Sequence, residues 1–404
     1  MSVDDVGVRR PIDHWLGEHG EGLIAIRRQM HAHPELSGEE HATTELVGER
    51  LRLAGLEPRE LASGTGLVCD LAADGDQRPR LALRADLDAL AMHDEKDVHY
   101  RSQVDGVAHA CGHDVHTTIM LGTALYYAHH RDELPGPLRF VFQPAEERVP
   151  GGAIDTIADS ALDGVEAIVG VHCDPKLDVG HVGLKAGAIS SAADMALITL
   201  IGPGGHTARP EETVDMITVA SRVVQELPAM VAAELDDPDS VKVVFGMINS
   251  GDAANVIPSH CSMKVSVRTP SDVVWEALPE IFERVLPKLL ADTGARHELE
   301  YTHGVPPVVN HEAMTSLVRE AATIELGVGS TTPAVQSWGG DDFAWYLREV
   351  PGTYVRVGTH DPAAGGPRLD LHAGSFDVDE AAIGVGVRVI VRTAAHYFAG
   401  PPPS

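Results

Sequence analysis

The sequence predicts an α/β protein in which a ferredoxin-like α+β domain is inserted into a larger α/β domain. The chain has 404 residues, more than one hydrophobic core usually organises. Three apolar segments of strand length, at residues 81–88, 138–147 and 167–173, each run directly into polar residues. Between residues 194 and 303 the order changes to strand, helix, two strands, helix and strand, which is typical of a split βαβ unit.

The first part of the chain carries helix signals followed by strand signals. Apolar residues at roughly helical spacing over residues 23–53, interrupted at His33 and Pro34 and closed by Gly55, predict two successive helices. The three strand-like segments come next. Ligands of open α/β sheets bind beyond the carboxyl ends of the strands. We therefore expect the polar residues at these strand ends to gather at one edge of the sheet, namely Asp86, Asp88, Glu146, Glu147 and His172.

The predicted inserted domain has strand signals at residues 194–202, 241–250, 260–268 and 297–303 and helix signals at 213–227 and 272–290. The polar, proline-containing stretch 302–312 then returns the chain to a pattern like that of the first part. We therefore assign residues 1–190 and 304–404 to the larger domain and residues 191–303 to the inserted domain.

Composition excludes two classes of partner. Sixty acidic residues against 31 basic ones give a formal net charge of -29, which would repel both a nucleic acid and an anionic membrane. The four cysteines form no CxxC pair, which favours a reduced compartment. We find neither an N-terminal apolar run typical of a signal peptide nor an apolar stretch of about 18 residues. We therefore expect a cytoplasmic protein that binds neither nucleic acid nor membrane.

The densest chemical signal lies at residues 109–116, HACGHDVH, which hold three histidines, a cysteine and an aspartate. If the first part of this segment is extended, Cys111 and His113 point to the same face and can approach one metal ion. The alternative is a histidine-rich loop that binds nothing.

Adjacent carboxylates, Glu146 and Glu147, follow an apolar strand in FQPAEE. Two buried carboxylates repel unless cations balance them. One could bind a metal while the other takes a proton from the attacking water, as metal-assisted hydrolysis requires. A solvated strand end is the alternative. His172, at the end of another apolar strand, and His372, near the C-terminus, carry weight only in combination with these residues.

Taken together, these motifs resemble the M20 peptidase family, in its aminoacylase, hippurate hydrolase and indole-acetyl-amino-acid hydrolase branch. The resemblance covers nearly the whole chain. Its nine pieces, in order, are RRQMHAHPELSGEE (27–40), LRADLDAL, HACGHDVHT, FQPAEE, GVHCDP, GGH (204–206), NVIP (255–258), GGDDF (339–343) and LHAGSF (371–376).

The resemblance implies a site with two divalent ions. Cys111 would bridge them, His113 and His172 would complete one ion's ligands, and Glu147 and His372 the other's. A thiolate suits zinc, and the remaining ligands suit zinc or manganese, with nickel and cobalt as alternatives.

The resemblance also assigns residues around these ligands. Glu146 would be the general base and acid, and Asp88 would support a metal-bound histidine. Asp114 and His109 are weaker candidates for such support. His116 is expected to open the following helix and has no assigned role.

The inserted domain resembles the family's lid and dimerisation domain, which implies a homodimer. His206 of one subunit would polarise the scissile carbonyl in the other subunit's site. Asn255 and Arg268, thirteen residues apart, would bind the substrate carboxylate. A turn histidine and a surface strand residue are the alternatives for His206 and Arg268.

The implied activity is that of a metal-dependent amidohydrolase acting on N-acyl amino acids or similar small amides. A dipeptidase or carboxypeptidase that uses the same site is the alternative, and a metal-binding scaffold without catalysis is disfavoured because Glu146 is retained. Two positions depart from the branch: Ala91 stands where proline is usual, and Glu211 where many members have histidine. The added negative charge would shift preference away from acidic substrates, and catalysis should survive.

Overall fold

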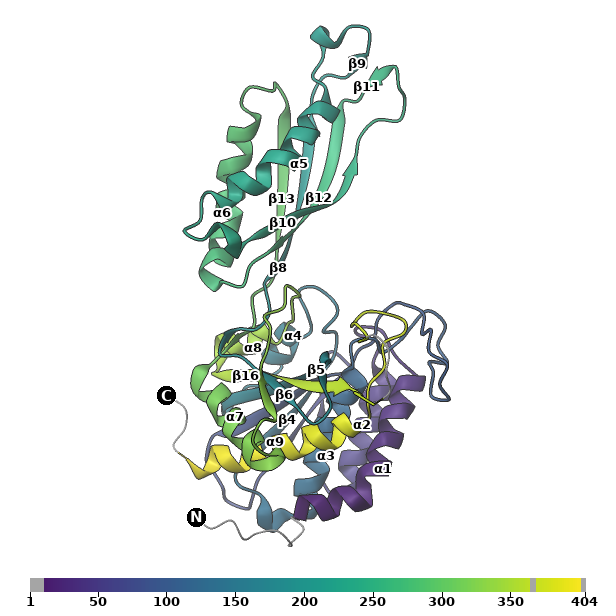
Figure 1. Ribbon diagram of the computed structural model, residues 1–404, viewed down its shortest axis with the longest axis vertical. Helices are drawn as coiled ribbons and strands as arrows, with labels where there is room; N and C mark the ends of the chain where they lie inside the picture. The colour runs from purple at the N-terminus through teal and green to yellow at the C-terminus, as the bar shows by residue number, and fades with distance from the viewer. Residues whose placement is uncertain (1–10, 364–367, 401–404) are drawn as a thin grey trace. The chain divides into compact units, whose positions relative to one another are not determined.

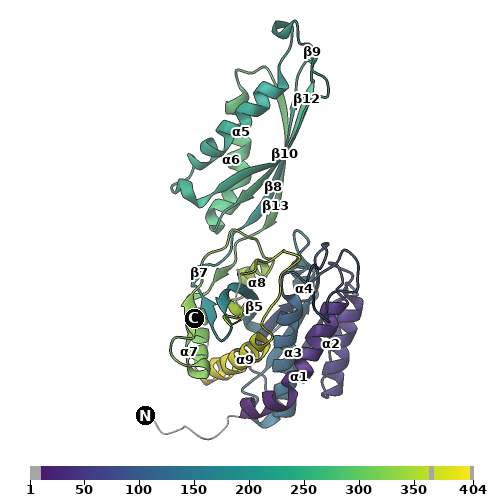
Figure 2. The same ribbon diagram turned by 45° about the vertical axis from the view of Figure 1, so that its right-hand side comes forward.

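The computed structural model describes residues 11–363 and 368–400, so the first ten residues, where we expect no signal peptide, lie outside the described residues. The chain divides into two compact units. Unit 1 contains the described residues of Met1–Gly187, Val309–Val335 and Trp345–Ser404, and unit 2 contains Ala188–Val308 and Gln336–Ala344. Figures 1 and 2 show the elements of each unit.

Unit 1 is built on a mixed sheet of eight strands in the order β1-β2-β4-β3-β5-β16-β6-β15. Its strands are β1 (Arg59–Glu60), β2 (Leu67–Leu71), β3 (Arg80–Asp86), β4 (Leu138–Gln143), β5 (Val165–Asp178), β6 (Val182–Leu184), β15 (Thr331–Pro333) and β16 (Gly352–His360). The neighbours β4, β3 and β5 are parallel. Their carboxyl ends therefore lie at one edge of the sheet, as the sequence predicts.

Two strand ends differ from the prediction. β4 ends at Gln143, because Pro144 has no N–H with which to continue the ladder. β5 runs on to Asp178, so His172 lies inside the strand rather than at its end.

Helices cover the sheet of unit 1. They are α1 (Pro11–Ala32), α2 (His41–Leu53), α3 (His113–His129), α4 (Ala153–Ala158), α7 (Glu312–Leu326), α8 (Ala344–Glu349) and α9 (Ala381–Ala399), with a 3₁₀ turn η1 (Arg131–Glu133). The two successive helices predicted within residues 23–53 are confirmed as the end of α1 and the whole of α2. α1, α3, α9 and α7 pack side by side (Figure 2). α3 is buried on nearly all sides, so the polar groups of its first turn need partners inside the protein.

Unit 2 has a four-stranded antiparallel sheet in the order β10-β12-β8-β13. Its elements are β8 (Ala193–Ile201), β9 (Gly205–His206), η2 (Pro210–Glu212), α5 (Met216–Ala232), η3 (Pro238–Ser240), β10 (Lys242–Asn249), β11 (Val256–Ile257), β12 (His260–Arg268), α6 (Asp272–Leu290) and β13 (Arg296–Val305), and two short strands, β7 (Gly187–Ala188) and β14 (Val309–Asn310), lie where the chain passes between units. The predicted order of strands and helices is confirmed. Residues alternate along β12, and its buried positions pack with α5 and α6 on one side of the sheet (Figure 1).

None of the helices within residues 11–363 and 368–400 has the length and apolar character needed to cross a membrane.

Candidate metal centre

Five predicted metal ligands come together in unit 1. Cys111, His113 and Glu147 each offer one ligand atom, and these three atoms lie within 4.8 Å of one another. His172 Nε2 is 3.4 Å from Cys111 Sγ, and His372 Nε2 is 3.4 Å from Glu147 Oε1. The five side chains thus form one continuous cluster.

Unpartnered atoms in this cluster fit a cation. His113 Nε2 and Glu147 Oε1 are buried and have no hydrogen-bond partner among the described residues. Leaving such groups buried without a hydrogen bond is costly, and a divalent ion would compensate both. Sulfur, imidazole nitrogen and carboxylate oxygen together suit zinc. The residues present therefore fit a metal site.

Glu147 lies close to one histidine of each predicted ligand set. Glu147 Oε1 lies 3.8 Å from His113 Nε2 and 3.4 Å from His372 Nε2. This carboxylate therefore stands between the two histidines and can share an ion with either.

A left-handed turn brings Cys111 and His113 together. Gly112 has φ 89°, and a Cβ at this position would lie 2.6 Å from Cys173 Sγ, so only glycine fits. α3 then begins at His113. The predicted extended arrangement of Cys111 and His113 is wrong: a turn followed by a helix start, rather than strand alternation, makes the side chains converge.

His116 lies in the first turn of α3 and does not open it, which corrects the prediction from the sequence. Its Nε2 accepts a hydrogen bond of 2.7 Å from the Cys173 N–H, so its Nδ1–H donates to Asp86 Oδ1 at 2.7 Å. Both ring nitrogens are hydrogen-bonded, so neither is free to bind a metal ion. His116 therefore supports the backbone next to His172 and does not act as a ligand. Its two partners lie 30 and 57 positions away in the chain, so no local pattern in the sequence could have identified this role.

The surroundings of His172 orient its ring and keep its imidazole neutral. Its Nδ1–H donates to the Cys173 carbonyl at 2.7 Å, which directs Nε2 to Cys111. Burial, and then the positive charge of Arg356, hold the pKa of His172 well below its usual range. The imidazole is therefore neutral at physiological pH, the form that binds metals.

Asp88 connects a predicted ligand to both glutamates. Its Oδ1 is 3.3 Å from His113 Nδ1, and it is almost fully buried. The backbone N–H groups of Glu146 and Glu147 donate to its two oxygens at 3.1 and 2.9 Å. One carboxylate thus contacts the side chain of His113 and the backbone of the two residues that follow β4.

Glu146 and Glu147 both direct carboxylate oxygens to the same ring nitrogen. Glu146 Oε2 lies 3.9 Å from His113 Nε2, close to the 3.8 Å of Glu147 Oε1. Both side chains are mostly buried. The site therefore holds one carboxylate among the ligand atoms and a second carboxylate beside them.

Among the described residues, neither Asp114 nor His109 makes a side-chain hydrogen bond or ion pair with the five ligands. Asp114 Oδ2 accepts hydrogen bonds from Arg27 Nε at 2.6 Å and His31 Nδ1 at 2.7 Å. His109 is buried, neither ring nitrogen has a hydrogen-bond partner among the described residues, and burial lowers its pKa to about 3. Asp114 thus anchors the start of α3 to α1.

The buried pair His31–Asp114 predicts a pH-dependent stability. Burial opposes charge on His31, but Asp114 and Asp94, 3.3 Å from Nε2, outweigh this effect and raise the pKa of His31 above its ordinary value of 6.5. The stabilisation is therefore complete below about pH 6.5 and is lost as the pH rises through the folded-state pKa. His31→Gln should cost about 2 kcal/mol at pH 6. In urea unfolding at equal metal loading, the difference in the free energy of unfolding between wild type and His31→Gln should become smaller towards pH 9. A difference that does not change with pH would contradict a charged His31 in the folded protein.

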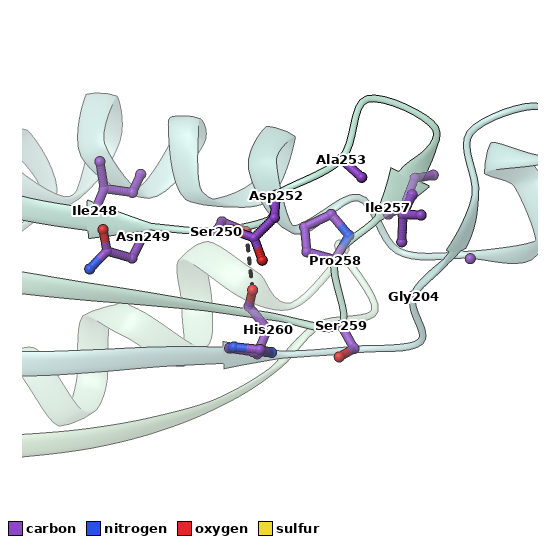
Figure 3. Close-up of a pocket in the computed structure, with 13 residues that line it drawn as sticks. Gly204, Ile248, Asn249, Ser250, Asp252, Ala253, Ile257, Pro258, Ser259 and His260 are labelled. Atoms are coloured by element: carbon purple, nitrogen blue, oxygen red, sulfur yellow. Dashed lines mark hydrogen bonds between the residues drawn. The ribbon is translucent and has the colours of Figure 1, made fainter.

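The predicted substrate-binding residues lie in unit 2, in two places. His206 is exposed in β9, which pairs with β11, and Val256 stands opposite it. Asn255 precedes β11, and its carbonyl accepts a hydrogen bond from the Thr207 N–H at 3.3 Å. A pocket of about 940 Å³ adjoins these strands, and the residues that line it include Gly204, Ser250, Ile257 and His260 (Figure 3).

Arg268 lies at the other end of β12. It is the last residue of that strand, is partly buried, and donates from Nε to Ser266 Oγ at 3.2 Å. β12 contains nine residues, so at about 3.3 Å per residue it spans about 26 Å. The structure therefore brings His206 and Asn255 together and does not bring Arg268 to them within one chain.

Comparisons with known proteins identify the family. The model of peptidase family M20/M25/M40 matches residues 82–396. An N-acetyl-L-cysteine deacetylase of Bacillus subtilis is 37% identical over 362 residues, which cover 89% of this chain and 84% of that protein. The solved structure of a Bacillus subtilis protein, described as a dinuclear metal-binding peptidase of the M20 family, has a TM-score of 0.83 and 32% identity and covers 95% of this chain and 99% of that chain.

A longer relative matches as well. A Rhodococcus jostii protein named as a candidate glutamate–cysteine ligase 2-3 is 42% identical over 369 residues. These residues are 91% of this chain but only 46% of that protein, so the chain spans about half of that relative's length. The predicted family and mixed α/β fold are confirmed by the family model and the solved structure. The chain belongs to peptidase family M20/M25/M40.

Proposed function

We propose that this protein is a metal-dependent amidohydrolase that cleaves the amide bond of N-acyl amino acids. One observation carries the proposal: His113 Nε2 and Glu147 Oε1, which are buried and have no hydrogen-bond partner among the described residues, meet Cys111, with a second carboxylate, Glu146, beside them. A purely structural metal site needs no such extra carboxylate. The similarity to an N-acetyl-L-cysteine deacetylase supports this substrate class.

Cys111, His113, Glu147, His172 and His372 would hold two divalent ions, with zinc or manganese favoured and nickel or cobalt as alternatives. When bound, the ions supply Lewis acidity, which lowers the pKa of a water and polarises the amide carbonyl. Glu146 takes the proton of the attacking water and delivers it to the leaving amine nitrogen. Asp88 holds His113 through Nδ1, so that Nε2 faces the ligand cluster.

Unit 2 is proposed to act on the substrate rather than on the metals, as a lid and dimerisation domain. None of the five proposed ligands belongs to it. Since β12 separates His206 and Asn255 from Arg268, the three residues can meet at one substrate only if they come from two chains. We infer a homodimer in which Arg268 binds the substrate carboxylate, while His206 and Asn255 of the other chain reach the carbonyl and carboxylate.

The proposal is tested with metal-free protein reconstituted separately with zinc, manganese, nickel and cobalt. N-acetyl and N-benzoyl amino acids should be hydrolysed, and free dipeptides, the substrates of the alternative activity, should be poorer. A chelator should abolish hydrolysis. Full activity without metal, or a clear preference for dipeptides, would overturn the assignment.

Cys111 gives a second readout of metal binding. The buried thiol should be a thiolate when it binds metal and inaccessible to reagents. Alkylating agents or peroxide should therefore inactivate metal-free protein faster than loaded protein, with the modification mapped to Cys111 by mass spectrometry. Equal rates with and without metal would argue against Cys111 as a ligand.

A further inference from the structure

The turn that follows β4 has an unusual backbone. Ala145 has φ 57°, in the left-handed region that non-glycine residues rarely adopt. The Gly152 N–H donates to the Ala145 carbonyl at 2.8 Å, and a Cβ at Gly152 would lie 2.0 Å from the Pro144 carbonyl oxygen. The turn is therefore closely packed on the side of Gly152.

This turn explains how two consecutive side chains face one histidine. Adjacent residues in an extended chain point to opposite sides. Here, Glu146 Oε2 and Glu147 Oε1 lie 3.9 and 3.8 Å from His113 Nε2. The bend at Ala145 precedes both residues, so the direction in which both carboxylates point depends on the geometry of the turn.

Two buried carboxylates hold three successive amides of the turn. The Ala145 N–H donates to Glu40 Oε1 at 2.8 Å. The next two N–H groups, of Glu146 and Glu147, donate to Asp88 at 3.1 and 2.9 Å. Glu40 is fully buried and Asp88 is nearly so. Charge-assisted hydrogen bonds of this kind are strong and directional.

The segment Ser37–Glu40 supports both carboxylates. The Gly38 N–H donates to Glu40 Oε1 at 2.8 Å, and the Ser37 hydroxyl donates to Asp88 Oδ2 at 2.6 Å. Glu40 precedes α2, yet its side chain does not cap that helix. Glu35 does so instead, through Ala42 N and Thr43 N at 2.9 and 2.8 Å. The carboxylate of Glu40 is thus directed to the turn at Ala145.

We propose that Glu40 is a positioning residue that holds Ala145 in its left-handed conformation and thereby aims Glu146 and Glu147 into the metal centre. The proposal rests on the function proposed above for these two glutamates. Glu40 acts through the backbone 105 positions away in sequence and is not among the proposed metal ligands or substrate-binding residues.

Three variants test the proposal in metal-loaded protein. Glu40→Ala removes the acceptor, so kcat should fall about a hundredfold, the cost of a misplaced catalytic group, with KM little changed. Glu40→Gln keeps an oxygen that can accept both N–H groups and should restore most of kcat. Glu40→Asp withdraws the acceptor by one methylene and should give an intermediate loss, which serves if the alanine variant does not fold.

Glu35→Ala is the matched control. It removes hydrogen bonds to α2 from the same loop, so it should lower thermal stability while leaving kcat close to that of wild type. Equal losses of kcat in Glu35→Ala and Glu40→Ala would show that the loop acts only through general stability, and would overturn the proposal.

Two further readouts do not depend on turnover. Hydrogen exchange of the peptide covering residues 144–147 should quicken in Glu40→Ala and remain slow in Glu35→Ala. The absorption bands of the cobalt-substituted protein should change in Glu40→Ala, because Glu147 is displaced, and recover in Glu40→Gln. Unchanged exchange and spectra would overturn the positioning role even if the wild type is active. An inactive wild type with the expected exchange and spectra would instead overturn the proposed substrate class.

Discussion

Glu146→Gln is expected to lower turnover of an N-acyl amino acid by about a hundredfold to ten-thousandfold while both metal ions still bind. The amide has the shape of the carboxylate, so hydrogen bonds of the neighbouring backbone to Asp88 should persist. It cannot accept the proton of the attacking water, and general acid–base catalysis contributes a factor of about 10² to 10⁴. kcat, KM and metal content by elemental analysis, all measured on one preparation, check the prediction.

Glu147→Gln is the matched comparison, one residue away in the same turn. Its Oε1 lies among the proposed ligand atoms, so this substitution should lower metal occupancy first, and excess metal should recover part of the activity. Excess metal should not rescue Glu146→Gln. If the two variants have the same metal content and the same residual rate, the division of roles within the pair is wrong.

The edge of the sheet where the site lies was predictable because it follows from a general rule. Parallel strands deliver their carboxyl ends to one edge, and β3 and β4 bring Asp88 and Glu146 there from positions 58 apart in the chain. The order of elements in unit 2 was predictable for a similar reason, since alternation along β12 is visible in the sequence. Periodicity indicates which face of a strand is buried, and the parallel order of the strands places their carboxyl ends at one edge of the sheet.

Other contacts could not be predicted from local patterns. Glu40 reads as an ordinary charged residue in a loop, and only the fold shows that it is buried and bonded to Ala145. The sequence gives His116 no role, and its support of the site is seen only once its partners Asp86 and Cys173 are known. In each case the role is set by a hydrogen bond between distant segments, which has no period and no fixed spacing.

Sequence spacing does not report the distance between two residues of unit 2. Asn255 and Arg268 are thirteen residues apart in the sequence. Nine of the intervening and terminal residues form β12, and a strand converts such spacing into separation. Asn255 and Arg268 of one chain therefore lie far apart, and both could contact one small substrate only if they came from two chains.

The activity lost in His206→Ala is expected to reappear when that variant is mixed with Glu146→Gln. Alone, His206→Ala should lose about a hundredfold to a thousandfold in kcat, the usual cost of removing one donor to a developing oxyanion, with metal content intact. In a mixed dimer, one site would combine the intact Glu146 of one chain with the intact His206 of the other, and the second site would carry both lesions. Half of the dimers in an equal, fully exchanged mixture would then hold one complete site, so roughly a quarter of wild-type activity should return.

The control for this experiment is a mixture of two lesions that lie in the same proposed half of the site. Arg268→Ala should mainly raise KM for substrates with a free carboxylate, and substrates amidated at that group should escape the penalty. In the proposed dimer, Arg268 and Glu146 of the same chain serve the same site. When Arg268→Ala is mixed with Glu146→Gln, one site of each mixed dimer therefore lacks Arg268 and the other lacks Glu146. No complete site should form in this mixture. Recovery in the His206 mixture alone, with subunit exchange verified by mass spectrometry, therefore indicates that His206 is the residue shared between chains. A His206 mixture no more active than its parents would mean that each chain completes its own site, and the length of β12 between His206 and Arg268 would then require a different substrate contact for one of them.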